Sequence, residues 1–135
     1  MCKFNDWGVP YSSILFFEGA VKGHRRVRSI KRERDIFFII ERDDNITLNT
    51  LLLNEYCFGL GALLKALEEF PDTEYIIYGG KWNNYTGDAD EYAKENKIGI
   101  FNYGDFLGAI NLTNPLNYVR ENERENKKDP FRTAQ

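Results

Sequence analysis

The chain has 135 residues, of which 42% are hydrophobic, 15% aromatic and 29% charged, with a formal net charge of −3. This composition is typical of one globular domain with a hydrophobic core. The longest apolar runs are too short to span a bilayer, and the start lacks a signal-peptide pattern, so a cytoplasmic protein without a membrane partner is expected. Cys2, Cys57 and His24 are too few and too widely spaced for a disulfide framework or a zinc site.

The first half of the chain predicts strands. Residues 12–21 are rich in aromatic and β-branched residues, with Gly19 and Gly23 near their end, and they are expected to form a strand. Residues 25–40 follow as one long strand or as two strands with a bend. No regular helix is expected in this region.

A second extended segment follows a polar turn. Residues 41–45, ERDDN, favour a turn because Asp and Asn side chains bond their own backbone. Residues 46–56 then return as the next strand. Both faces of 35–41 and 46–56 are apolar, which predicts interior strands of a sheet that is covered on both sides.

After residue 58 the hydrophobic period changes from that of a strand to that of a helix. An amphipathic helix is expected over 59–70, stopped by Pro71. Its apolar face comprises Leu60, Leu63, Leu64, Leu67 and Phe70. The expected elements beyond it are a strand at 73–80, a helix capped by Thr86 that reaches about Asn96 with Ala89, Tyr92 and Ala93 inside, a strand at 98–101 and a helix at 104–112.

The order of elements is therefore β-β-β-α-β-α-β-α. Antiparallel strands followed by alternating strands and helices predict a mixed α/β fold, with a central mixed sheet flanked by helices. Residues 1–112 are assigned to one domain. Residues 113–135 are expected to form a polar C-terminal helix, begun by Asn114 and Pro115, or a disordered tail.

Basic residues concentrate in one segment. Residues 22–34, KGHRRVRSIKRER, carry seven Lys or Arg and one Glu, a balance of +6 that leaves −9 for the rest of the chain. Such a patch predicts binding to the phosphates of DNA or RNA. The candidate contacts are Lys22, Arg25, Arg26, Arg28, Lys31, Arg32 and Arg34. The alternative is a solvated strand whose charges only keep a sheet edge soluble.

Two carboxylates are candidates for a metal site. If the loop at 43–45 has three residues, Asp35 faces Leu53, and Glu55 is its diagonal neighbour on the same face, at roughly 7–8 Å between backbones. Carboxylates at that separation can share one Mg²⁺ or Mn²⁺. A two-residue loop would place them on opposite faces.

Two segments carry a resemblance to a known family. DIFFIIERDDNITLNTLLLNEY resembles the strand–turn–strand of the restriction-endonuclease-like superfamily, and YIIYGGKWNNYTGDADEYAKENKIGIFNYGDFLGAI resembles the closing half of its Mrr-like branch. The resemblance covers about residues 35–112. It implies a metal-dependent nuclease core in which Asp35 and Glu55 hold the metal ion and Glu18 stands in for an auxiliary acid, although Glu18 is expected here on a strand.

The same resemblance places Cys57 where the superfamily has its catalytic lysine. A thiol cannot replace an ammonium group that orients the attacking water and offsets charge on the phosphate. Lys81, which follows a predicted strand, is the candidate substitute and the third candidate catalytic residue. Lys65 is expected to face solvent, and Lys31 and Arg34 are weaker candidates that flank Asp35.

Three functions remain open from the sequence. The preferred one is a degenerate nuclease-fold protein that binds nucleic acid, or a partner that processes nucleic acid, without catalysis. The others are an active Mg²⁺- or Mn²⁺-dependent endonuclease and an inhibitor or immunity-type module that binds a protein. Each candidate site residue also has a structural interpretation: Asp35 paired with Arg32 or Arg34, Glu55 in water, Cys57 in the core. The small size and the resemblance are compatible with a homodimer.

Overall fold

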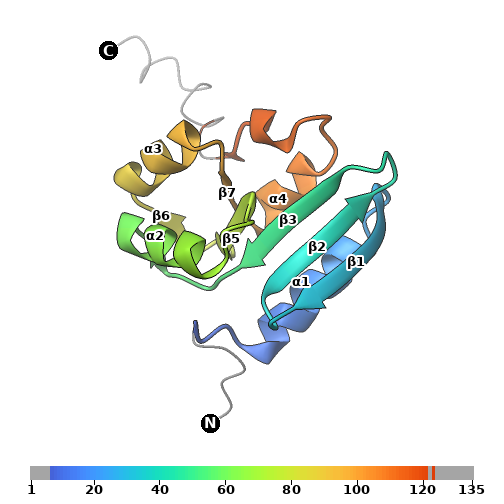
Figure 1. Cartoon of the computed structure of the whole chain (residues 1–135), viewed down its shortest axis with the longest axis horizontal. Helices are drawn as coiled ribbons and strands as arrows, with labels where there is room; N and C mark the ends of the chain where they lie inside the picture. Colours follow the sequence, from blue (N-terminus) through green and yellow to red (C-terminus); the bar gives the residue numbers. More distant parts are fainter. Residues whose placement is uncertain (1–6, 122, 124–135) are drawn as a thin grey trace.

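The computed structural model describes residues 7–121 and 123, which form a mixed α/β fold (Figure 1). Its five-stranded sheet has the strand order β1-β2-β3-β5-β7, and a two-stranded sheet of β4 and β6 lies beside it. This confirms the predicted fold class at the level of a mixed sheet with helices on its faces.

The first element is a helix. Helix α1 spans Tyr11–Lys22, so the prediction of a strand at residues 12–21 is wrong. Its buried residues Ile14, Phe17 and Val21 recur at i, i+3 and i+7, which is the period of a helix. Burial of that single face against the sheet stabilises the helix despite the aromatic and β-branched residues in it.

The next three strands form an antiparallel meander: β1 (Val27–Glu33), β2 (Phe37–Arg42) and β3 (Thr47–Leu52). Residues 34–36 make a tight reversal between β1 and β2, where a continuous strand or a bend was predicted. The three-residue loop at 43–45 is confirmed, because the Arg42 amide donates to the Ile46 carbonyl at 2.9 Å.

The second half alternates strands and helices. In chain order it contains β4 (Cys57–Phe58), α2 (Leu60–Glu69), β5 (Tyr75–Gly79), β6 (Asn84–Tyr85), α3 (Gly87–Glu95), β7 (Gly99–Asn102) and α4 (Tyr103–Ala109). Strand β5 runs parallel to both β3 and β7. The predicted helix cap is confirmed, since the Thr86 hydroxyl accepts from the Ala89 amide.

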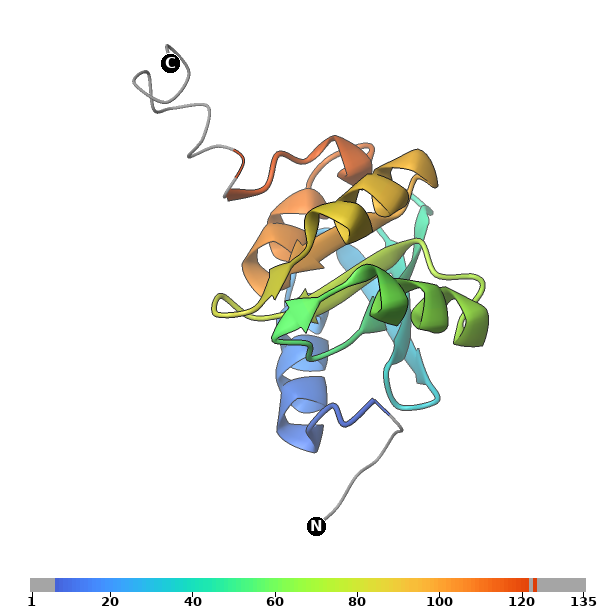
Figure 2. The same ribbon diagram turned by 90° about the vertical axis from the view of Figure 1, so that its left-hand side faces the viewer.

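The helices cover the two faces of the sheet unequally. Helices α1 and α4 lie on one face, and α2 and α3 on the other, where they cover mainly β5 and β7 (Figures 1 and 2). On the first face Phe17 lies 5.1 Å from Phe38 and 5.8 Å from Phe106 between ring centroids. On the second face Phe37 stacks on Phe70 at 5.7 Å. Aromatic burial on both faces therefore fixes the layers.

The segment after α4 packs back onto the domain as far as the structure describes it. A 3₁₀ turn spans Pro115–Asn117 and is capped by the Asn114 side chain, as the sequence predicted for a helix start. Arg120 is buried and reaches the carbonyl of Ile100. The remainder of the predicted C-terminal helix or tail, residues 122 and 124–135, lies outside the described residues.

Within the described ranges, no helix combines the length and the apolar character that crossing a membrane would require.

Candidate functional site

Asp35 lies at the tip of the β1–β2 hairpin instead of on the predicted strand. Arg34 and Asp35 have φ angles of 49° and 68°, and the Ile36 amide donates to the Arg34 carbonyl at 2.8 Å, so the chain reverses within three residues. The Arg32 guanidinium donates to the Asp35 carboxylate at 3.1 Å. It also lies 3.5 Å from the carboxylate of Glu18. One arginine therefore bridges the first predicted metal ligand and the auxiliary acid.

The position of Glu18 corrects the sequence-based expectation. Glu18 lies on helix α1, not on a strand, and the helix presents it to the side chain of Arg32. A helix therefore precedes the first strand, where the sequence pattern predicted a strand. The structural interpretation of Asp35, a pair with a neighbouring arginine, is the one that the structure shows.

Glu55 follows β3 but lies beside β5. Its amide donates to the Tyr78 carbonyl at 2.8 Å, and its own carbonyl accepts from the Asn83 side chain at 2.8 Å. The carboxyl group is half-buried, and burial raises its pKa, while the positive charge of Lys65 opposes that shift. After Leu52 the chain leaves β2 and follows β5, and this takes Glu55 away from the pairing that the hairpin register alone predicts.

The geometry gives the predicted metal pair no support. In residues 7–121 and 123, no three His, Cys, Asp or Glu side chains are grouped so that they could hold a metal ion. Asp35 is paired with Arg32, and no contact that the structure describes joins it to Glu55. A guanidinium on the Asp35 carboxylate competes with a divalent cation for the same oxygens. Mg²⁺ or Mn²⁺ binding by Asp35 and Glu55 stays a prediction.

Two residues bear on the missing catalytic lysine: Cys57, which takes its place in the sequence, and Lys81, the candidate substitute. Cys57 is a free, exposed thiol on β4, where the structural interpretation placed it in the core. Lys81 lies in the turn after β5, which the Asn83 amide closes by donating to the Gly80 carbonyl at 3.0 Å. Its ammonium nitrogen lies 6.0 Å from the centroid of the Trp82 ring. No described contact joins Lys81 to either predicted metal ligand.

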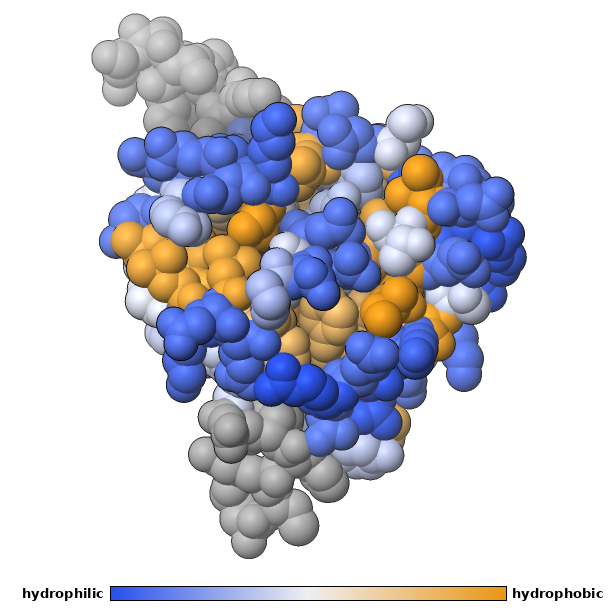
Figure 3. Space-filling view, viewed as in Figure 1, coloured by the Kyte–Doolittle hydropathy of each residue, from blue (hydrophilic) through white to orange (hydrophobic). Residues whose placement is uncertain are grey.

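Most charges of the basic segment are neutralised within the chain. Strand β1 is an edge strand, and hydrophilic side chains line the rim of the molecule that it forms (Figure 3, right). Five of the seven predicted phosphate contacts form ion pairs. These are Arg26 with Asp43 and Asp44, Arg28 with Glu41, Lys31 with Glu33, Arg32 with Glu18 and Asp35, and Arg34 with Glu69, at 3.0–3.5 Å. Only Lys22 and Arg25 form no ion pair with a described residue.

This pairing changes what the basic segment can do. The prediction assumed that its like charges needed an external anion, but carboxylates of α1, α2 and the two hairpins already lie against them. A phosphate backbone would have to displace these intrachain partners before it released counterions. His24 is likewise used internally, since its Nδ1 accepts from the Arg26 amide and its Nε2 lies 3.0 Å from the Leu107 carbonyl. Both of its ring nitrogens therefore lie against backbone groups of this chain.

A polar cavity lies where parallel strands β5 and β7 end. In open α/β sheets, ligands bind beyond the carboxyl ends of the strands. The cavity has a volume of about 290 Å³. Its lining residues are Tyr78, Lys81, Asn83, Asn84, Asn102, Asp105 and Glu121. The charged members, one lysine and two carboxylates, sum to −1. Asp105 is only 5% exposed, and one of its carboxylate oxygens accepts from the Glu121 amide at 3.2 Å.

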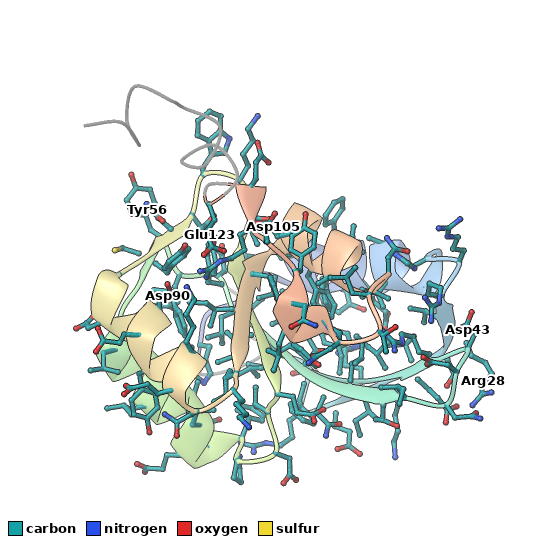
Figure 4. All side chains as sticks on the ribbon, turned by 90° about the horizontal axis from the view of Figure 1, so that it is seen from above. Arg28, Asp43, Tyr56, Asp90, Asp105 and Glu123 are labelled. Atoms are coloured by element: carbon teal, nitrogen blue, oxygen red, sulfur yellow. The ribbon has the colours of Figure 1, made fainter. Side chains whose placement is uncertain are left out.

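Two aromatic rings project from the chain beside this cavity. Tyr56 and Trp82 are 81% and 83% exposed, the highest exposures among the large hydrophobic side chains that the structure describes. They belong to one small module, because the Asn84 amide donates to the Tyr56 carbonyl at 2.9 Å and β4 pairs with β6. Figure 4 shows Tyr56 at the same end of the molecule as Asp105 and Glu123, whereas Arg28 and Asp43 lie at the opposite end.

A buried arginine supports this end of the molecule. Arg120 donates to Asp90 at 2.9 Å and to Glu123 at 3.0 Å, and its guanidinium lies 4.5 Å from the centroid of the Tyr85 ring. The pKa of Glu123 falls to about 2: although burial acts against the shift, the hydrogen bonds and positive charge of Arg120 outweigh it. Burial raises the pKa of Tyr78, chiefly by desolvation of the phenolate. These contacts hold α3, β7 and the C-terminal segment in place behind the cavity.

Most of these residues were not predicted from the sequence. Tyr56, Asn102, Asp105 and Glu121 carried no motif, and only the segment YGGKWNNYTG, residues 78–87, offered a signal, since it combines glycines with aromatic residues after a strand. The cavity could have been placed from topology, because the carboxyl ends of neighbouring parallel strands meet at one edge. Which side chains remain exposed there depends on packing that the pattern does not encode.

Comparison with protein-family models finds no match for this chain, and comparisons with curated proteins and with solved structures find none either.

Proposed function

We propose that this chain is a binding protein with a nuclease-like core that does not cleave phosphodiesters. Its target is nucleic acid or, better supported by the charges, a protein that itself works on nucleic acid. The nuclease-like core rests on the resemblance of residues 35–112. The mixed sheet with helices on both faces supports it only at the level of the fold class. The observation that carries the loss of catalysis is the Arg32 guanidinium between Asp35 and Glu18.

Three features support the absence of chemistry. The positive charge beside Asp35 is the guanidinium of Arg32, so the carboxylate is already neutralised within the chain. Glu55 follows a different strand from the hairpin that carries Asp35, and no described contact brings the two carboxylates together. Cys57 supplies no ammonium group where the resemblance requires one.

The charges favour a protein over a nucleic acid. Five of the seven basic side chains in residues 22–34 are paired with carboxylates of this chain, which leaves little positive potential for a phosphate backbone. The most exposed aromatic side chains lie instead at the opposite end, beside carboxylates. Tyrosine and tryptophan are the side chains that most often dominate the energetics of protein interfaces.

A cleavage assay tests the loss of catalysis. Supercoiled DNA, single-stranded DNA and structured RNA would be incubated with the wild type, Asp35→Ala and Glu55→Ala, each with Mg²⁺, Mn²⁺ or EDTA. We expect no cutting by any form. Metal-dependent cutting by the wild type that disappears in both variants would refute the proposal and establish an endonuclease.

A second assay tests the role of Arg32. If the Arg32 guanidinium occupies the place of a metal cation, Arg32→Ala leaves the carboxylates of Asp35 and Glu18 without it. We then expect the variant to bind Mn²⁺ more tightly than the wild type in calorimetric titration. Arg28→Ala is the matched control, because it removes another arginine of β1 that pairs with Glu41 and not with Asp35 or Glu18. Tight Mn²⁺ binding by the wild type would contradict the assignment.

A further inference from the structure

We infer that the surface formed by Tyr56, Trp82 and the adjoining cavity docks a basic segment of a protein partner, with one arginine side chain of that partner entering the cavity. The surface is called the carboxyl-end surface below, and it is defined by these two rings and the lining residues Lys81, Asn102, Asp105 and Glu121. The inference rests on the proposed function and names the class of partner that its best-exposed surface fits.

The shape of the site fits one long side chain. The cavity of about 290 Å³ opens beside the loop that carries Lys81 and Trp82. It is lined by amide, hydroxyl and carboxylate groups and by the ammonium group of Lys81, so it suits a polar group better than an apolar one. A planar guanidinium, which donates in a fixed fork to carboxylates and amide oxygens, matches such a lining.

The charge of the site selects a cation. Asp105 is nine-tenths buried and faces the cavity, Glu121 is exposed at its rim, and Lys81 is a flexible cation that a ligand can displace into solvent. A phosphate would meet both carboxylates at close range and gain only Lys81. A guanidinium can donate charge-assisted hydrogen bonds to the Glu121 carboxylate and to the Asp105 carboxylate, one oxygen of which also accepts from the Glu121 amide.

The two rings supply the apolar part of the interface. Tyr56 and Trp82 are both more than four-fifths exposed, and neither is needed to cover the core. An aromatic face attracts the aliphatic stem and the cationic head of an arginine. Rings of this kind, next to a pocket that takes a charged side chain, form the usual centre of a protein interface.

The segment that carries the rings is held rigidly, which lowers the entropy lost on binding. The Asn83 side chain accepts from the Gly80 amide at 3.1 Å and donates to the Glu55 carbonyl at 2.8 Å, so the turn is tied to the chain beside Tyr56. Gly79 has a φ of 149°, and a Cβ at this residue would lie 2.5 Å from the Asn83 side chain. The turn geometry therefore depends on the glycine and on the asparagine together.

The test uses the isotope-labelled full chain and follows its amide and indole signals by NMR. The probes are blocked arginine (N-acetyl-arginine methylamide), blocked citrulline, which has nearly the same shape without the charge, and oligothymidine. We expect blocked arginine to shift the signals of Gly80, Trp82, Asn102 and Asp105 in a saturable way, and citrulline to shift them at least tenfold less at equal concentration.

Two variants distinguish an effect of charge on arginine binding from a loss of folding. Glu121→Gln, at an exposed position, should weaken the arginine response several-fold, and Lys81→Gln should strengthen it, because it removes the competing cation. Opposite effects of two exposed substitutions cannot arise from loss of folding. An arginine response that neither variant changes, or equal responses to arginine and citrulline, would refute the inference.

Oligothymidine distinguishes this inference from the proposed function. If oligothymidine shifts Tyr56 and Trp82 and blocked arginine does not, the surface stacks unpaired bases; the inference then fails, while the proposed function as a non-catalytic binding protein stands. Metal-dependent cleavage in the assay above would instead overturn the proposed function, whatever the surface binds.

Discussion

The two ends of this molecule differ in how their charged side chains are paired. At the β1–β2 end nearly every basic side chain is paired with a carboxylate of the same chain, and the two exceptions flank the end of α1. At the carboxyl-end surface, two aromatic rings stay exposed beside carboxylates that line a cavity. The opposite placement of Arg28 and Asp43 against Tyr56 and Asp105 is visible in Figure 4.

A run of like charges in a sequence therefore does not by itself define a binding surface. The sum over residues 22–34 is +6, yet the acids that neutralise it come from other elements of the fold, including Asp43 in the next hairpin and Glu69 on α2. A fold can return those acids to the same edge. The surface that keeps large aromatic rings exposed beside a polar cavity is the better indication of where a partner binds.

The largest expected effect concerns the buried arginine that anchors the charged end. Arg42 is fully buried, pairs with Asp44 and donates to the carbonyls of Ile110, Leu112 and Thr113. Arg42→Ala should lower the free energy of unfolding by about 3–5 kcal/mol, because it leaves a cavity where the largest fully buried side chain was and removes the donor to the buried Ile110 carbonyl. Urea unfolding measures this.

Arg28→Ala is the control for that measurement. Arg28 pairs with Glu41 at 3.1 Å, but its side chain is 48% exposed, so its removal should change the free energy of unfolding by less than about 1 kcal/mol. Equal losses of unfolding free energy in Arg42→Ala and Arg28→Ala would show that the buried arginine stabilises the fold no more than a surface arginine does.

The second prediction removes the internal neutralisation. In the combined variant Glu41→Gln, Asp43→Asn and Glu69→Gln, the basic segment loses three of its carboxylate partners. Affinity for a short DNA duplex at low salt should rise roughly tenfold over the wild type, with a steeper dependence on salt. Fluorescence anisotropy of a labelled duplex measures both. The charge-matched control is the combined variant Glu91→Gln, Glu95→Gln and Asp72→Asn, at acids that form no ion pair with a described residue.

An unchanged duplex affinity would mean that the intrachain pairs do not mask the segment. Strong duplex binding by the wild type itself, with a steep salt dependence, would mean that phosphates displace those pairs easily, and would favour the nucleic-acid form of the proposed function.

The third prediction concerns pH. The pKa of Glu123 lies at about 2 in the folded protein, against 4.5 for an unperturbed glutamate. A lowered pKa stabilises the fold above pH 4.5, and this contribution is lost as the pH falls toward 2. Because Glu123 is partly exposed, Glu123→Gln should cost only about 1 kcal/mol at neutral pH. Unfolding at a series of pH values should show the gap to the wild type closing between pH 4.5 and 2; a constant gap would contradict the cause assigned to the shift.

The smallest effect on stability is expected at the exposed rings. Tyr56→Ser and Trp82→Ser should change the free energy of unfolding by less than about 0.5 kcal/mol, since neither ring is buried. Tyr85→Ser is the contrast, because Tyr85 is half-buried and contacts both Arg120 and Tyr78. Thermal unfolding compares the three variants. A large loss at Tyr56 or Trp82 would give these rings a structural role and weaken the case for docking.

Much of the fold followed from local patterns. The helix over 59–70 was predicted from its apolar period, and the Thr86 cap from its residue type; the loop at 43–45 was one of two lengths considered, and it set the register correctly. Helix α1 was missed because aromatic and β-branched residues dominate its composition. The spacing of Ile14, Phe17 and Val21, which is helical, was the better signal.

The candidate site was less accessible from the sequence for a physical reason. Asp35 and Glu55 could be assigned a shared face only if both strands continued in register, whereas the chain reverses at Asp35 and leaves β2 after Leu52. The pairing of Arg32 with Glu18 joins two elements through long side chains, and no spacing rule predicts it. Exposure of Tyr56 and Trp82 depends on which neighbouring surfaces remain uncovered after folding.

The most direct test of the central claim is a comparison of two ligands on one protein. A labelled peptide containing several arginines and a labelled DNA duplex would be titrated with the wild type and with Trp82→Ser, with the citrulline peptide as control. We expect saturable binding of the arginine peptide that weakens at least tenfold in Trp82→Ser, and weak duplex binding that this substitution leaves unchanged. Tight duplex binding together with no preference for the arginine peptide would contradict it.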